Sequence, residues 1–270
     1  MSFRLIFHGT HPIISRLEIF YHLYAPMLSG YPMRDYEKWA MILTRQKAFW
    51  HFSKSGFKDL LQAMDKIAKK KPLDDKEWEA VLLAAQIELP EWARKELNRR
   101  TKYVEREWKK VRDVFVDVIS SIHPGSLWKP VHVYTTFENT GHGGSGVSRD
   151  VLVMNLPVNR KFDSERARRV TKILIHEVIH IMHERDTTFN RFLRAYERKH
   201  HIPIHEAYTN ALMDFTWWRA GQQEDMFAEY YEREWKDLCD VEDRMRKTIK
   251  NWWEHGGDLK KMIVEEFKDG

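Results

Sequence analysis

The sequence has little of what disulfide-rich, membrane and secreted proteins depend on. Cys239 is its only cysteine, so no disulfide can form within the chain, and we expect a reducing, cytoplasmic location. No run of about 18 uncharged apolar residues occurs, so we expect no membrane span. Residues 1–20 are broken by charged and histidine side chains and lack a small-residue cleavage site, so no signal peptide is expected.

An excess of charge of one sign is also missing. The 45 basic and 40 acidic residues leave a net charge of only +5. The chain has no module of interleaved basic and aromatic residues and no C-x-x-C pair, so a nucleic-acid-binding protein is the least favoured class. Steep salt dependence of binding would identify that class.

Residues 11–122 have the apolar periodicity of helices. Asp74 and Asp75 are candidate caps for one of them, and Pro90 opens a longer one. The periodicity predicts that the following side chains face the core: Trp78, Val81, Leu82, Trp92, Leu97, Val104, Trp108, Val111 and Phe115. We therefore divide the chain into a helical N-terminal region, 1–125, and a second region, 126–270.

The second region starts differently. Residues 131–137 (VHVYTTF) alternate and are rich in β-branched side chains, and residues 151–156 (VLVMNL) form a short apolar run, so both predict strands. The glycine-rich stretch 140–150 between them lacks G-K-[ST] and is therefore no ordinary phosphate loop. It is either a hairpin connection or a mobile rim that carries His142. The fold class predicted from these patterns is α+β, mainly α.

The stretch from Ile173 to Glu184 reads ILIHEVIHIMHE. On a helix with His176 at 0°, His180 lies near 40°, His183 near −20° and Glu177 near 100°, all approximate values from the helical period. Most of the remaining circumference is apolar, so the helix is expected to be buried. Polar groups on a buried helix need partners. His176 and His180, one turn apart, can both direct a ring nitrogen at one divalent metal.

This stretch matches HExxH and resembles the motif of the zinc metallopeptidases called zincins. The resemblance implies that His176 and His180 bind a zinc ion and that Glu177 acts as the general base. It also implies a small sheet whose edge strand lies antiparallel to the substrate, followed by the active-site helices. In the gluzincin subgroup the third ligand is a Glu on a later helix, which Glu206 matches. Asn210 stands where that subgroup often has an Asp, and could support a ligand histidine.

Several residues compete with Glu206 for the third ligand position. His183 shares the stripe but lies about 10 Å of helical rise from His176, so it is more simply a hydrogen-bonded neighbour. The other competitors are Glu184, Glu197, His200, His201 and His205. Candidates for an oxyanion donor are Tyr208, Tyr230, Tyr231, His205 and His255, and the sequence does not choose among them.

These patterns favour a zinc-dependent metallohydrolase that acts on a peptide or protein substrate, with residues 126–270 as a zincin-like catalytic region. Two alternatives remain. The chain could be a binding or regulatory protein in which the metal only stabilises the fold, as a closed four-ligand site would indicate. The other alternative is the nucleic-acid-binding protein described above.

Overall fold

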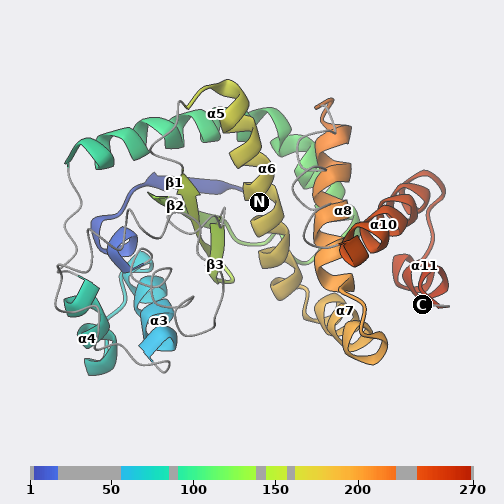
Figure 1. Ribbon diagram of the computed structural model, residues 1–270, viewed down its shortest axis with the longest axis horizontal. Helices are drawn as coiled ribbons and strands as arrows, with labels where there is room; N and C mark the ends of the chain where they lie inside the picture. Colours follow the sequence, from blue (N-terminus) through green and yellow to red (C-terminus); the bar gives the residue numbers. More distant parts are fainter. Residues whose placement is uncertain are drawn as a thin grey trace. The chain divides into compact units, whose positions relative to one another are not determined.

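The computed structural model describes residues 3–17, 56–84, 91–137, 144–156, 162–222 and 236–268 (Figure 1). It is mainly helical with one small mixed sheet, as predicted. Contacts divide the chain into two compact units. The sheet unit comprises Arg4–Glu107 and Lys129–Glu177, and the helical unit comprises Met1–Phe3, Trp108–Trp128 and Val178–Gly270. Two of the boundaries between the units, after Glu107 and after Glu177, fall inside long helices. The predicted division at residue 125 remains a prediction.

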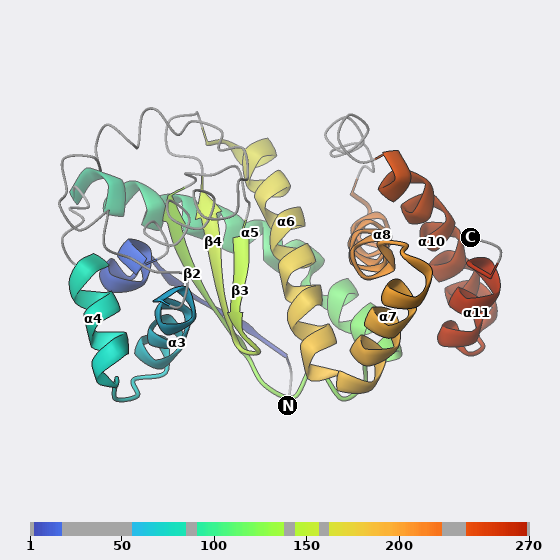
Figure 2. The same ribbon diagram turned by 60° about the horizontal axis from the view of Figure 1, so that its bottom comes forward.

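The sheet has four strands in the order β1-β2-β4-β3 (Figure 2). They are β1 (Leu5–Gly9), β2 (Val131–Phe137), β3 (Gly144–Ser148) and β4 (Val151–Leu156). β1, β2 and β4 are parallel, and β3 at the edge is antiparallel to β4. The predicted strands 131–137 and 151–156 are confirmed as β2 and β4.

Two expectations about the sheet were wrong. The stretch 140–150 does not join β2 and β4 as a hairpin, because those strands are parallel and β3 lies between them in sequence. His142 lies outside the described residues. The region 1–125 is not wholly helical, because it supplies β1, which pairs with β2 far along the chain. A pairing between strands so far apart in the sequence leaves no recognisable pattern within the five residues of β1.

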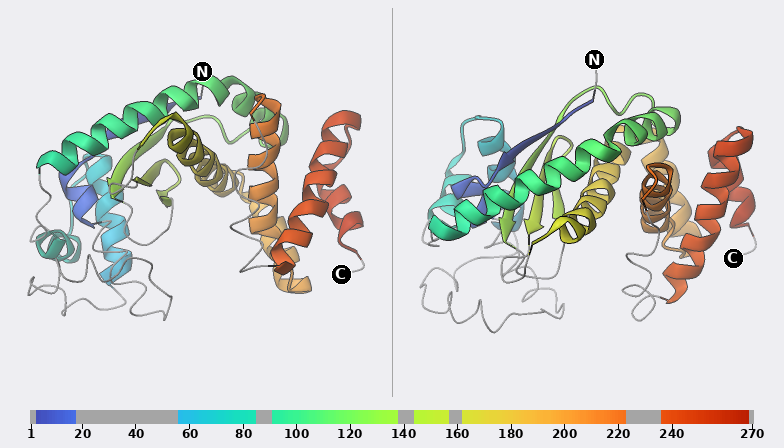
Figure 3. Two further views of the ribbon diagram at one scale, coloured as in Figure 1. Left: turned by 45° about the horizontal axis from the view of Figure 1, so that its top comes forward. Right: turned by 90° about the horizontal axis from the view of Figure 1, so that it is seen from above.

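Among the described residues, two whole helices after β1 and the first parts of two more belong to the sheet unit. They are α3 (Gly56–Ala68), α4 (Asp75–Ala84), the start of α5 (Glu91–Ile122) and the start of α6 (Ser164–Arg185). Figure 3 shows α5 as one uninterrupted helix. Thr101 of α5 hydrogen-bonds Thr135 of β2 with 2.8 Å between the hydroxyl oxygens, so this part of α5 covers the sheet face opposite His132 and Tyr134.

Asp74 caps α4, as predicted. Its carboxylate accepts from the Glu77 N–H at 3.0 Å, while the Glu77 carboxylate accepts from the Asp74 N–H at 2.8 Å. The reciprocal cap, with an ion pair to Lys66, buries Glu77 and rotates the helix so that Ala80, Val81 and Ala84 face inward. Trp78 and Leu82 are therefore exposed, contrary to prediction.

The inward face predicted for α5 is mostly confirmed. The exception is Trp92 near its start, which is 61% exposed. Buried as predicted are Leu97, Val104, Trp108, Val111 and Phe115.

In the described part of the chain, the helical unit contains the end of α5, the second half of α6 and four further helices. These are α7 (Thr187–His200), α8 (Ile204–Arg219), α10 (Lys236–His255) and α11 (Leu259–Glu266). α8 packs along α10, and Tyr196 of α7 donates a hydrogen bond to the Phe267 carbonyl at 2.8 Å, just after α11. Nearly all of α8 is buried, which places its few polar side chains in the interior.

Candidate metal centre

Helix α6 carries the HExxH motif. The carboxylate of Asp163 accepts from the Arg166 N–H at 3.0 Å and caps its start. The apolar positions around the motif are at most 1% exposed: Leu174, Ile175, Val178, Ile179, Ile181 and Met182. His176, Glu177 and His180 are only partly buried. The motif therefore presents a polar, accessible stripe on an otherwise buried helix.

Helix α8 brings a carboxylate to that stripe. Glu206 stands in the first turn of α8, and its Oε2 lies 3.4 Å from Nε2 of His180. His176 precedes His180 by one turn of the same continuous helix. One ligand atom from each of His176, His180 and Glu206 lies within 4.8 Å of the other two. The three predicted ligands therefore occur together, with the donor types that zinc prefers and at a spacing that one ion can bridge.

Glu177 lies beside this group without belonging to it. It is partly exposed, and it joins neither of the two metal-binding groups found among the described residues. Its place on the helix, about 100° from His176, keeps its carboxylate beside the ligands. A carboxylate in this position can accept a proton from a water held next to it.

His183 and His205 form a second group with His180. Ligand atoms of the three histidines also lie within 4.8 Å of one another. His183 is fully buried and His205 is 9% exposed, while the His180 and His205 rings stack with centroids 5.2 Å apart. His183 thus associates with His205 rather than with His176, as the axial separation along α6 implies. His180 is common to both groups.

The remaining competitors have other local roles. The Glu197 carboxylate accepts from the His205 N–H at 3.1 Å and so gives a partner to one of the backbone N–H groups in the first turn of α8. His201 ends α7 in the left-handed conformation, His200 stacks on Tyr196, and Glu184 is exposed. None of these four residues belongs to a metal-binding group in the described part of the chain.

A buried hydrogen-bonded chain, which the sequence did not reveal, lies next to His183. The Asp186 carboxylate is 3.0 Å from Nδ1 of His123, and the Tyr208 hydroxyl is 3.1 Å from Nε2 of the same ring. Burial lowers the pKa of His123, although Asp186 partly opposes that shift. A neutral His123 donates from Nδ1 to Asp186 and accepts from Tyr208. In the sequence, His123 is followed by Pro124 and Gly125, a pattern that by itself indicates only the end of a helix.

The hydrogen bonds of His123 help to decide which residue could serve as the oxyanion donor. Tyr208 is fully buried and its hydroxyl is engaged with His123, which argues against that role. His255 is exposed at the end of α10, where Nδ1 lies 3.2 Å from the Asn251 carbonyl. Tyr230 and Tyr231 lie outside the described residues. His205 is the candidate that the structure places beside a predicted ligand.

Asn210 faces away from the predicted ligands and toward α10. Its side-chain amide donates to the Glu242 carboxylate, which is 3.2 Å from Arg246. Burial is the main cause that raises the pKa of Glu242. Arg246 in turn pairs with Asp214 at 2.7 Å. Asn210 therefore connects α8 to α10, and within the described part of the chain it makes no hydrogen bond to a histidine of the predicted ligand set.

No protein-family model, curated protein or solved structure matches this chain. Within the described residues, no helix has both the length and the apolar surface needed to traverse a bilayer.

Proposed function

We propose that the chain is a zinc-dependent metallohydrolase of the zincin type, and that its substrate is a peptide or protein. The observation that carries the proposal is the convergence of His176, His180 and Glu206, two imidazoles and a carboxylate from two helices. All three are partly exposed, so a water or substrate could reach an ion held there. An open position of this kind is typical of catalytic zinc sites.

His176, His180 and Glu206 would hold the zinc, which when bound would polarise a water and the substrate carbonyl. Glu177 would accept the proton of that water at a carboxylate oxygen and later donate it to the leaving amine. A general base must remain off the metal to do this, which agrees with the absence of Glu177 from both groups of the described residues.

The edge of the sheet is an argument that the substrate is a peptide. β3 forms an edge of the sheet and is antiparallel to β4. An edge strand offers backbone N–H and C=O groups with which an extended peptide can pair. The resemblance to zincins implies this arrangement, in which main-chain hydrogen bonds hold the substrate independently of its side chains.

A second candidate function rests on the buried histidines. His183 and His205 lie beside His180, so an ion held mainly by these three residues would be shielded from solvent. A closed site of that kind stabilises a fold rather than catalysing a reaction. In that case the protein would be a metal-stabilised binding or regulatory protein.

Glu177→Gln separates the two candidates. The catalytic proposal expects zinc content and thermal stability to stay at wild-type levels while the cleavage of a mixed peptide library falls by roughly 10²–10⁴. Glu184→Gln is the matched control, because it makes the same change on an exposed residue of the same helix. Equal cleavage by wild type and Glu177→Gln, or no zinc-dependent cleavage by the wild type, would favour the metal-stabilised binding protein.

A further inference from the structure

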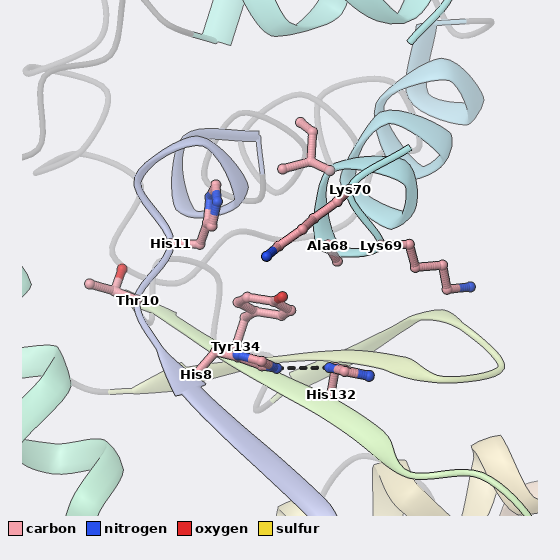
Figure 4. A pocket seen from close by; sticks show the side chains of 9 residues that line it. His8, Thr10, His11, Ala68, Lys69, Lys70, His132 and Tyr134 are labelled. Carbon is pink, nitrogen blue, oxygen red and sulfur yellow. Dashed lines mark hydrogen bonds between the residues drawn. The ribbon is translucent and has the colours of Figure 1, made fainter. Parts of the chain in front are cut away.

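A pocket of about 710 Å³ lies in the sheet unit, next to the strands β1 and β2 (Figure 4). The end of α3 forms its opposite wall. Its described lining consists of His8, Thr10, His11, Ile67, Ala68, Lys69, Lys70, His132 and Tyr134. A pocket of this volume is large enough for a small organic molecule. None of the described lining residues carries a carboxylate.

The alternation of β2 explains which side chains reach the pocket. Val131 and Val133 are fully buried on one face of the sheet, so His132 and Tyr134 project from the other. Tyr134 stacks on His8 of the neighbouring strand, with ring centroids 4.6 Å apart. The pocket floor therefore includes the rings of His8, His132 and Tyr134 on this face of the sheet.

The turn after β1 brings His11 to the same place. Gly9 has a φ of +70°, and a Cβ there would lie 2.3 Å from the side-chain oxygen of Asn98. That oxygen accepts from the Thr10 N–H at 2.9 Å. Glycine thus permits the close approach that holds the turn, and the turn directs His11 over Tyr134, where the two rings meet edge to face.

Lys70 has an unusual backbone for a lysine. It follows α3 with a φ of 54°, and the N–H groups of Lys70 and Lys71 bond the carbonyls of Ile67 and Lys66. This is the helix-ending motif in which glycine is usual at the left-handed position. A lysine there is strained by its Cβ, and strain of this kind is concentrated at functional sites.

The side chain of Lys70 extends over the pocket. Figure 4 shows its ammonium group between His11 and Tyr134, while the side chain of Lys69 points away. Lys69 is already neutralised by Asp65 at 2.7 Å and Asp150 at 2.6 Å. For Lys70 no ion pair is found within the described part of the chain. Lys70 therefore brings to the pocket an exposed positive charge that no described carboxylate pairs with.

The paired histidines can adjust to a ligand. Nε2 of His8 lies 2.8 Å from Nδ1 of His132, so one ring donates a hydrogen bond to the other. Burial, followed by the proximity of His132 and His11, lowers the pKa of His8. A negative charge in the pocket would oppose these effects and raise the pKa of His8.

We propose that this pocket binds a small molecule through a doubly charged oxyanion, such as a phosphate group. Lys70 supplies the fixed positive charge, and His8, His11 and His132 supply ring N–H donors on the other sides. The proposal does not rest on the metal centre, which lies on other residues.

Sulfate is the sharpest probe, because its charge stays at −2 between pH 6 and pH 8. Calorimetric titration of the protein should give saturable binding at pH 6 that weakens at pH 8, because a bound anion favours the protonated forms of His8 and His11, whose pKa values are lowered by burial in the empty pocket. The titratable groups that line the pocket in the described structure are His8, His11, Lys69, Lys70, His132 and Tyr134, and the ammonium group of Lys69, directed away from the pocket, pairs with Asp65 and Asp150.

Lys70→Gly tests the role of the lysine without a cost to the fold, since glycine adopts the left-handed conformation freely. Sulfate affinity should fall by roughly two- to fivefold, the effect of one exposed charge, while the melting temperature stays unchanged or rises. Lys71→Ala, which removes a neighbouring exposed lysine, should leave affinity unchanged. Titrations with inorganic phosphate and adenosine monophosphate would then show whether the ligand is a free anion or a larger phosphate ester.

Two results would overturn the proposal. One is the absence of saturable sulfate binding by the wild type at pH 6. The other is an equal affinity of wild type and Lys70→Gly. A parallel titration of His176→Ala should match the wild type, and a loss of sulfate binding in that variant would place the anion at the metal centre instead.

Discussion

The described structure contains two groups of histidines whose charged neighbours have opposite signs. His180 lies 3.4 Å from the carboxylate of Glu206, whereas the pocket that contains His8 is lined by lysines and by no described carboxylate. An imidazole can ligate a cation through its lone pair or donate its N–H to an anion. The neighbouring charges therefore indicate which ligand each group would attract.

Removal of His180 should have the largest effect, because this residue belongs to both of the described groups that could hold a metal ion. We expect His180→Ala to weaken zinc binding by at least roughly 100-fold, more than the loss of an outer-sphere partner usually costs. The measurement is competition with a chelator of known zinc affinity. His132→Ala removes a histidine from the other group and should leave zinc affinity unchanged. A similar loss of zinc affinity in both variants would contradict the view that only the group containing His180 binds a metal.

Glu206→Ala should weaken zinc binding by at least about tenfold, because it removes the only carboxylate of the proposed ligand set. Glu197→Ala is the matched control. Glu197 accepts from the N–H of His205, so its loss should lower the free energy of unfolding by about 1 kcal/mol without changing zinc affinity. If instead His183→Ala and His205→Ala release zinc while Glu206→Ala retains it, the three-histidine group is the metal site.

The buried His123 should make stability depend on pH. Its pKa lies below the ordinary value of 6.5, so as pH falls through 6.5 the unfolded chain takes up a proton before the folded chain does. The free energy of unfolding should therefore decrease below pH 6.5, at up to about 1.4 kcal/mol per pH unit. The lowered pKa of Asp186 adds a further loss only below about pH 3.8.

Thermal unfolding in the presence of a chelator, from pH 7.5 to pH 5, would measure the effect of His123 apart from metal release. His123→Gln should be less stable than the wild type at pH 7.5 but should lose less stability on acidification. Parallel pH profiles for the two proteins would contradict the assignment of a neutral His123.

The smallest effect is expected for Tyr208→Phe. This change removes the hydroxyl that reaches His123 and leaves a buried ring nitrogen without its donor. We expect a loss of about 1–2 kcal/mol in the free energy of unfolding, the usual cost of one such group, with zinc affinity unchanged. Chemical denaturation measures the first quantity and chelator competition the second. A large loss of zinc affinity would mean that Tyr208 positions a metal ligand.

The parts of the structure that the sequence predicted depend on local pattern. Alternation in VHVYTTF gave the bounds of β2, and the helical period placed His176 and His180 on one stripe. Glu206 was identified by resemblance and by its place in the first turn of its helix. Where the pattern failed, a competing local interaction was responsible, as when the Asp74–Glu77 cap rotated α4 and exposed Trp78.

Features built from distant segments left no such signal. β1 pairs with β2 more than a hundred residues along the chain, and the pocket joins His8 to His132 in the same way. The Asp186–His123–Tyr208 chain also draws on three separate elements. Each residue alone has an ordinary local explanation, so only the tertiary structure reveals what they form together.

The proposal of a catalytic zinc site is tested most directly by locating the metal in crystals of the zinc-loaded protein, through anomalous scattering at the zinc edge. We predict one strong peak, bonded to nitrogens of His176 and His180 and to an oxygen of Glu206, with a water in the fourth position. A peak bonded to His180, His183 and His205, with Glu206 directed into solvent, would contradict the proposal, and so would the absence of a peak near α6.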